Sequence, residues 1–264
     1  MGIKFNLRPG KIVVVEFFGK IGGPIKSPVY EKLIERLRKD KSCKALVLDI
    51  DSPGGTVTDS EYIYHVLSRF GSDKPIVSNV RGLGASGAYL IACAGRTIVA
   101  SPGAIVGSIG VISIRPMVEE LLKKAGIDVN VTKTGLYKDM GAYWRPTTKE
   151  EEIKLQSFVD ESYKRFLEVV INARGMSKAG VENLANGEVF WGASALENGL
   201  VDKLGTLDTA IDVASELAKC KRRVVTLGPK KSLMQKITGS LSSSLVDSTV
   251  NELETRIWSD YVRY

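Results

Sequence analysis

The sequence predicts an α/β protein built around a largely buried sheet. Over the first 135 residues, short runs rich in Val and Ile alternate with stretches of helical periodicity, the pattern of βαβ units. A length of 264 residues with 44% hydrophobic side chains supplies enough apolar material for a packed core. From residue 147 onward the pattern changes to longer helices, so we expect a helical extension on the C-terminal side.

Short apolar runs bounded by turn residues predict five strands, at Ile12–Phe18, Ala45–Ile50, Pro75–Val80, Thr97–Ala100 and Asp128–Lys133. The first helix is expected after Ser27-Pro28, because Ser is a frequent N-cap and Pro fits the first turn. The buried stripe of the second helix is predicted from helical spacing: Tyr62, Ile63, Val66, Leu67 and Phe70. Further helices are expected over residues 87–94, 148–173, 178–185, 193–198 and 207–218, and an amphipathic helix over 246–261.

The net charge of +7 is concentrated in one late segment. Seven basic residues and no acidic one lie between 217 and 246, which leaves 30 basic against 30 acidic residues elsewhere. No aromatic residues are interleaved with them, so nucleic acid is not a predicted partner. We therefore expect two parts, a folded domain over residues 1–218 and a basic segment with the amphipathic helix over 219–264.

Cysteine and histidine usage excludes several kinds of site. Cys43, Cys93 and Cys220 are odd in number and widely spaced, so neither a disulfide framework nor a metal motif is predicted. The single histidine, His65, lies on the polar face of its helix. A Ser-His-Asp triad and a histidine metal site are therefore not expected, and no nucleotide-binding loop is present. We predict no metal and no cofactor.

Two glycine-rich junctions follow predicted strands and precede predicted helices. In Asp51-Ser52-Pro53-Gly54-Gly55, backbone N–H groups can be presented to an oxyanion; a plain tight turn is the alternative. In the second junction Ser86 stands between Ala85 and Gly87 at the start of an apolar helix. That setting is typical of a nucleophile turn, although a helix N-cap is the simpler reading of Ser86 alone.

A nucleophilic serine needs a base, and without a usable histidine the available base is lysine. A lysine amine can act in this way when burial lowers its pKa. Lys138 is the best candidate by context, because aromatic and apolar residues surround it in the segment Gly135–Trp144. Most other basic residues are expected to be solvated.

Four motifs occur in order: SPGG, GxxASGAYLIACA, SPGAIVGSIGVI and YKDM. Together they resemble the signal peptide peptidase A (protease IV) family of serine-lysine peptidases, over about residues 12–218. The resemblance implies a Clp/crotonase-type ββα superhelix with a C-terminal helical extension. It implies Ser86 as the acyl-forming nucleophile, Lys138 as the general base and Ser108 as the residue that orients Lys138. The oxyanion hole would be formed by the N–H groups of Gly55 and Gly87.

The resemblance also implies partners and a location. Family members form homo-oligomeric rings and accept extended peptides, including remnant signal peptides and other membrane-derived hydrophobic peptides. They are membrane-associated through an N-terminal anchor. No anchor is written in this sequence, so we expect either a truncated form or a soluble, cytoplasmic branch. The basic segment and last helix can supply peripheral membrane contact instead.

Two other functions are compatible with paired glycine junctions. A crotonase-type acyl-CoA hydratase or isomerase also builds an oxyanion hole from two such junctions, but it lacks a serine nucleophile at the second. An inactive ring-forming scaffold of the same fold is the non-enzymatic alternative. The presence of both Ser86 and Lys138 favours peptide hydrolysis.

Overall fold

A computed structural model of the chain describes residues 10–227. Its central sheet has eight strands in the order β6-β5-β3-β2-β1-β8, with β4 paired to β3 and β7. The strands are β1 Lys11–Phe18, β2 Cys43–Ser52, β3 Ile76–Ala85, β4 Thr97–Ala100, β5 Ile105–Gly107, β6 Val189–Trp191, β7 Lys203–Leu204 and β8 Val224–Leu227. All pairs are parallel except the antiparallel pair β5·β6.

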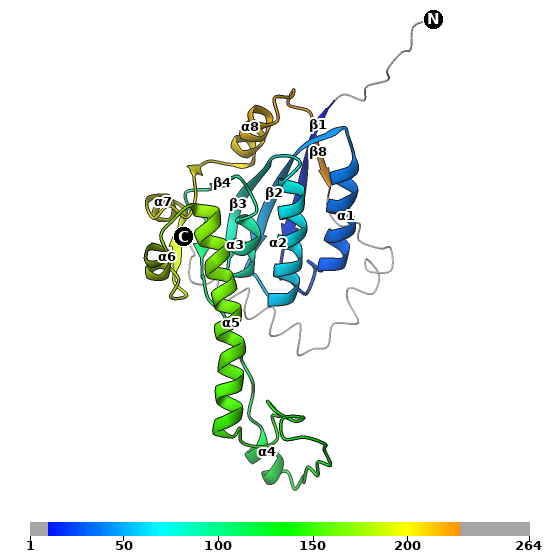
Figure 1. The fold of residues 1–264 in the computed structure, drawn as a ribbon, viewed down its shortest axis with the longest axis vertical. Helices are drawn as coiled ribbons and strands as arrows, with labels where there is room; N and C mark the ends of the chain where they lie inside the picture. The colour runs from blue at the N-terminus through cyan, green and yellow to red at the C-terminus, as the bar shows by residue number, and fades with distance from the viewer. Residues whose placement is uncertain (1–9, 228–264) are drawn as a thin grey trace, which may run out of the picture.

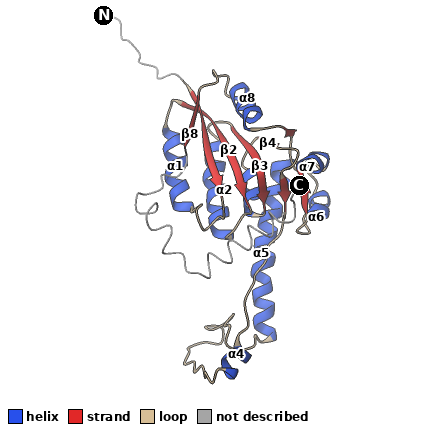
Figure 2. Cartoon of the chain, turned by 180° about the vertical axis from the view of Figure 1, so that it is seen from behind, coloured by secondary structure: helices blue, strands red, loops and turns tan. Residues whose placement is uncertain are grey.

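Helices cover both faces of the sheet. They are α1 Ser27–Lys39, α2 Val57–Gly71, α3 Gly87–Ala92, α4 Glu119–Lys124, α5 Lys149–Arg174, α6 Lys178–Leu184, α7 Gly192–Glu197 and α8 Leu207–Leu217. Figure 1 shows α1 and α2 in front of the strands, and Figure 2 shows the strands in front of these helices from behind. None of the helices in the described part of the chain is long and apolar enough to span a bilayer.

Alternation along the strands divides the core into two layers. On β1, Val13 and Val15 belong to the layer that packs with α1, α2 and α3, whereas Ile12 and Val14 pack with α8 on the other face. Successive side chains of a strand point to opposite faces, and both faces are covered, so the strands are continuous apolar runs. This confirms the α/β fold class that the sequence predicts.

The segment over residues 111–148, called the arm below, projects away from the sheet with the N-terminal half of α5 (Figure 1). It contains α4 and is otherwise turns and irregular structure. Many of its large apolar side chains are exposed: Ile112, Ile114, Met117, Leu121, Ile127, Val129, Val131, Leu136, Tyr137 and Tyr143. The arm therefore carries an apolar surface that the rest of residues 10–227 leaves uncovered.

Several sequence expectations need correction. Residues 128–133, expected as a strand, are exposed and irregular, because apolar alternation alone does not supply a partner strand. Tyr62, expected in the buried stripe, is 57% exposed. Ser27 begins α1 instead of capping it. The other four strands and the helices up to 218 are confirmed within a few residues, except that β3 continues to Ala85.

The sheet continues past residue 218. β8, which lies within the expected basic segment, pairs in parallel with β1, and Arg222 forms ion pairs with Asp208 and Asp212 of α8. The expected helix over 246–261 lies outside the described residues. The division of the chain at residue 218 stays a prediction.

Candidate active site

Ser86 joins the end of β3 to the start of α3 in a backbone conformation that is rare for a residue with a side chain. Its φ and ψ angles are 54° and −126°, and such strain costs of order 1–3 kcal/mol. Ordered neighbours hold it there: the Ser86 N–H donates to the carbonyl of Gly107 at 2.8 Å. A strained serine between a strand and a helix is the geometry of a nucleophile elbow.

The SPGG turn packs directly against this elbow. A Cβ added to Gly54 would lie 2.7 Å from the Gly87 nitrogen and 2.9 Å from Cβ of Ser86. Only glycine allows so close an approach of two backbones. The two glycine-rich junctions are therefore adjacent, as their positions after neighbouring parallel strands predict.

The backbone nitrogens of two glycines lie beside Ser86. Gly87 is the first residue of α3, and the first N–H groups of a helix have no partner within it. Around Gly55, Ile21 N–H donates to Gly54 and Thr56 N–H donates to Ile21, which leaves the Gly55 N–H outside that bridge. A Cβ on Gly87 would lie 3.6 Å from the Gly55 nitrogen. The arrangement can hold an oxyanion formed on a carbonyl attacked by Ser86.

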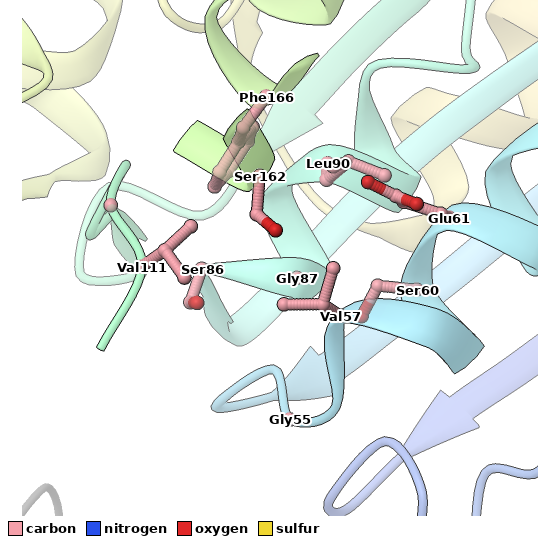
Figure 3. A pocket seen from close by; sticks show the side chains of 11 residues that line it. Gly55, Val57, Ser60, Glu61, Ser86, Gly87, Leu90, Val111, Ser162 and Phe166 are labelled. Atoms are coloured by element: carbon pink, nitrogen blue, oxygen red, sulfur yellow. The ribbon is translucent and has the colours of Figure 1, made fainter. Parts of the chain in front are cut away.

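A small pocket opens over these groups (Figure 3). It has a volume of about 30 Å³, room for about two water molecules. Its lining residues come from four parts of the chain: Gly55, Val57, Ser60, Glu61, Ser86, Gly87, Leu90, Gly110, Val111, Ser162 and Phe166. The sequence does not predict that Ser162 and Phe166 of α5 line the pocket. Helical spacing marks Phe166 as a buried residue, but it does not indicate that α5 packs near the Ser86 turn.

Ser108 follows Gly107, the residue whose carbonyl accepts from Ser86, so it lies next to the elbow in the fold. Its φ of 49° is also positive, and its N–H donates to the carbonyl of Glu188 at 2.7 Å. Two strained serines thus occur on neighbouring turns, at the end of β3 and at the end of β5.

Histidine and cysteine are not part of the pocket. His65 is exposed on α2, as the sequence predicts. Cys43 and Cys93 are buried, and burial raises the pKa of the Cys93 thiol to about 12. Since a thiolate is the reactive form of cysteine, Cys93 is inert at neutral pH, and Ser86 is the only hydroxyl or thiol on a strained turn that faces the pocket among the described residues.

Lys138 does not lie beside Ser86 in its own chain. Its side chain is exposed on the arm, and Lys154 of α5 stacks on the ring of the preceding residue, Tyr137, at 5.1 Å. Ser162, the nearest pocket residue along α5, is eight residues further, which is about 12 Å of helix. The structure therefore brings together Ser86, Gly55, Gly87 and Ser108, and it places Lys138 elsewhere.

Two family models match the chain: "Peptidase family S49" over residues 68–221 and "Clp protease" over residues 14–105. The first includes Ser86, Ser108 and Lys138, and the second includes the SPGG turn and Ser86.

Individual proteins agree with these matches. The chain is 37% identical to a putative protease of Synechocystis sp., covering 87% of this chain and 83% of that protein. It is 32% identical to the chloroplastic serine protease SPPA of Arabidopsis thaliana, covering 89% of this chain but only 37% of the relative. A solved structure of a membrane-bound stomatin-specific protease mutant aligns with a TM-score of 0.53 at 15% identity, covering 85% of this chain and all of that one, which supports the same fold.

Proposed function

The chain belongs to peptidase family S49, and from this premise we propose that it is a serine endopeptidase that uses Ser86 and Lys138 as a dyad. The observation that carries the proposal is the strained turn at Ser86, with the Gly55 and Gly87 N–H groups beside it. A peptidase of this kind needs a nucleophile, an oxyanion hole and a base. The first two are supported by the geometry of one subunit.

In the proposed reaction, Oγ of Ser86 attacks the scissile carbonyl while its proton passes to the neutral amine of Lys138. The carbonyl oxygen becomes an oxyanion, which accepts hydrogen bonds from the two glycine N–H groups. Collapse of this intermediate breaks the C–N bond, and the lysine ammonium returns the proton to the leaving amine. A water molecule, deprotonated by the same lysine, then attacks the acyl carbonyl; the bond to Oγ of Ser86 breaks, Oγ takes the proton from the lysine ammonium, and the acyl group leaves as the free acid product. The Ser108 hydroxyl orients the lysine amine.

Lys138 reaches this site from a neighbouring subunit in our proposal. In one chain Lys138 is on the arm, next to Tyr137, whose ring contacts Lys154 of α5. Lys154 lies about 12 Å along the helix from Ser162, the nearest pocket residue of α5. Insertion of the arm next to the pocket of a second copy would bring the amine to Ser86 and would exclude water from it. Exclusion of water favours the neutral form of an amine, which is the form that can accept a proton.

The apolar surface of the arm supports such an assembly. Monomeric soluble proteins rarely expose contiguous apolar patches of this kind, and large ones mark interfaces. The Clp-type fold commonly forms rings, which agrees with a homo-oligomer in which each arm covers the next subunit. The site of one isolated subunit would be incomplete.

The proposed substrate is an extended peptide with a small or apolar side chain beside the scissile bond. The pocket is lined by small residues (Gly, Ser) next to Ser86 and by the apolar side chains of Val57, Leu90, Val111 and Phe166, which supports a small or apolar residue at this position. Remnant signal peptides and other membrane-derived hydrophobic peptides have this composition. Contact of the chain with a membrane surface, or a cytoplasmic location, belongs to the same proposal.

The test uses a fluorogenic peptide library and four proteins: wild type, Ser86→Ala, Lys138→Ala and His65→Ala. We expect Ser86→Ala and Lys138→Ala to lose peptide cleavage, and His65→Ala to cleave as fast as wild type. Activity of the wild type should be greater at alkaline than at neutral pH if the base is an amine, because only its neutral form accepts a proton. Wild-type cleavage by Ser86→Ala would refute the mechanism, and turnover of an enoyl-CoA by all four proteins would favour the hydratase alternative.

Mixing distinguishes a shared site from a self-contained one. Ser86→Ala subunits keep an intact arm, and Lys138→Ala subunits keep an intact nucleophile. If the dyad forms between subunits, co-refolded mixtures of the two inactive variants recover activity in proportion to the mixed contacts. If Lys138 serves the Ser86 of its own chain, the mixture stays inactive.

A further inference from the structure

The turn that carries Lys138 is attached to α5 on both sides of the lysine. On one side, Lys154 of α5 lies over the ring of Tyr137 at 5.1 Å. On the other side, Asp139 is bound by Arg145, which also binds Glu151 in the first turn of α5. The side chain of Lys138 itself is exposed. The backbone on both sides of the lysine is therefore held on α5, while the lysine side chain is left exposed among the described residues.

Arg145 is the centre of this attachment. Its Nε and Nη2 donate to the two carboxylate oxygens of Asp139, each at 2.8 Å, and Nη2 also donates to the Asp139 carbonyl at 3.2 Å. Its Nη1 and Nη2 donate to the two carboxylate oxygens of Glu151 at 2.9 and 2.6 Å. Two bidentate pairs of this kind need the planar fork of a guanidinium, which the point charge of a lysine does not replace.

Glu151 connects this cluster to the helix. Its side chain is 3% exposed, and it forms a capping box with Thr148, in which each residue binds the backbone N–H of the other. The guanidinium of Arg145 lowers the pKa of Glu151 to about 2 and holds the pKa of Asp139 well below its ordinary value. Lys133 adds a second cation on Asp139 at 2.5 Å. All members are thus charged at neutral pH.

These contacts decide where Lys138 lies relative to the rest of the subunit. Residues 125–148 contain no helix or strand, so no ladder of backbone hydrogen bonds fixes them. Helix α5 is one continuous element that lines its own pocket through Ser162 and Phe166 and starts at the Arg145 cluster. A rigid connection therefore runs from the pocket of one subunit to the lysine offered to the next.

We propose that Arg145 is a positioning residue, which holds the Asp139 side of the Lys138 turn on α5 so that the amine enters the neighbouring pocket at a fixed place. The proposal rests on the function proposed above, because it assigns to Arg145 the task of placing that base. Arg145 touches neither the substrate nor Ser86, and it acts through Lys138. A displacement of about 1 Å in a reacting group can cost about 100-fold in rate.

The primary experiment compares Arg145→Gln with Arg38→Gln in the full chain. Arg38 is a matched control, because it also joins two carboxylates, Glu35 and Asp73, on a surface away from the arm. We expect kcat to fall about 100-fold in Arg145→Gln with KM changed less than about threefold and with the oligomer mass unchanged. Arg38→Gln should retain wild-type kcat. A wild-type kcat in Arg145→Gln would overturn the proposal.

A change that only weakens assembly would lower the oligomer mass instead. In that case Asp139→Asn, which removes one charge and keeps the shape, replaces Arg145→Gln. The proposal expects this variant to assemble and to lose kcat; loss of assembly in both variants would overturn it, because the cluster would then build the interface instead of placing the base.

Mixed oligomers separate this proposal from the proposed function. A Ser86→Ala, Arg145→Gln double variant mixed with Lys138→Ala contains no arm with both Lys138 and Arg145, and we expect the recovered activity to be about 100-fold lower than in the mixture of the two single variants. Full recovery there, alongside recovery in the mixture of the two single variants Ser86→Ala and Lys138→Ala, would overturn the role of Arg145 and leave the shared dyad standing. No recovery in the mixture of single variants would overturn the shared dyad, whatever Arg145→Gln does.

Discussion

Gly55→Ala tests the oxyanion hole more directly than a change to Ser86 does, because it leaves the nucleophile in place. A Cβ at residue 55 would lie 1.9 Å from the carbonyl oxygen of Ile21, and Cβ atoms are essentially never found within 3.0 Å of another heavy atom. The backbone at residue 55 must therefore move by about 1 Å or more. The φ of +154° at Gly55 adds strain for any other residue.

The size of the expected loss follows from this displacement. The Gly55 N–H is one of the two proposed donors to the oxyanion, and removal of one such donor costs about 100- to 1,000-fold in kcat, or about 3–4 kcal/mol of transition-state stabilisation. We expect Gly55→Ala to lose kcat by at least about 100-fold, with a smaller change in KM, since the ground-state carbonyl binds the same donors weakly.

Gly103→Ala is the matched control, because a Cβ there meets nothing within 4 Å. Both variants are assayed for peptide cleavage, and their folded fraction is measured by circular dichroism during thermal unfolding. Activity is compared per folded molecule, so that a loss of stability in Gly55→Ala is separated from a loss of catalysis. A folded Gly55→Ala protein with the kcat of wild type would refute the assignment of the oxyanion hole.

Three further predictions concern the thiols, acid stability and the C-terminal strand. Alkylation of the native protein at pH 8 should label the partly exposed Cys220 and spare Cys93, whose burial raises its pKa to about 12; mass spectrometry of the labelled peptides reads this out. Glu151 has an ordinary pKa of 4.5 that Arg145 lowers to about 2, so its contribution to stability is present above about pH 4.5 and is lost as the pH falls toward 2. The difference in Tm between wild type and Glu151→Gln should therefore be constant from pH 9 to 5 and shrink below that. Truncation after Leu227 should keep β8 on the sheet, whereas truncation after Ala218 removes it and should lower Tm by about 5 °C or more; equal Tm values would contradict this.

The strands β1 to β4 and the Ser86 elbow could be predicted from the sequence because their signals are local, whereas β5 to β8, of two to four residues each, were not predicted. Buried parallel strands are continuous apolar runs, and each of the two glycine-rich turns is written within about five residues. The closeness of the two turns can also be predicted, because β2 and β3 are adjacent parallel strands whose C-terminal ends lie at one edge of the sheet.

The structure of the arm was not predicted correctly from the sequence, for a physical reason. Residues 128–133 alternate like a strand, but a strand forms only where a partner offers its N–H and C=O groups, and the described residues offer none there. The apolar pattern predicts burial, which in a monomer would mean the core. Here the apolar side chains are exposed on a projection, and in the proposed assembly they are buried against another copy of the chain.

The separation of Lys138 from Ser86 could not be predicted from the sequence either. The spacing of 52 residues between them is compatible with a dyad in one chain or across two, since it fixes neither the direction of α5 nor the place of the arm. The structure supplies both: α5 begins beside the Arg145 cluster in the arm and lines the pocket at Phe166, further along the helix. In the proposed mechanism, Lys138 can act as the base only when the arm of one subunit meets the pocket of a second. Peptide cleavage by the proposed enzyme should therefore fall with dilution below the dissociation constant of the oligomer, which an assay over a concentration series measures, and a constant specific activity down to the monomer would contradict the shared site.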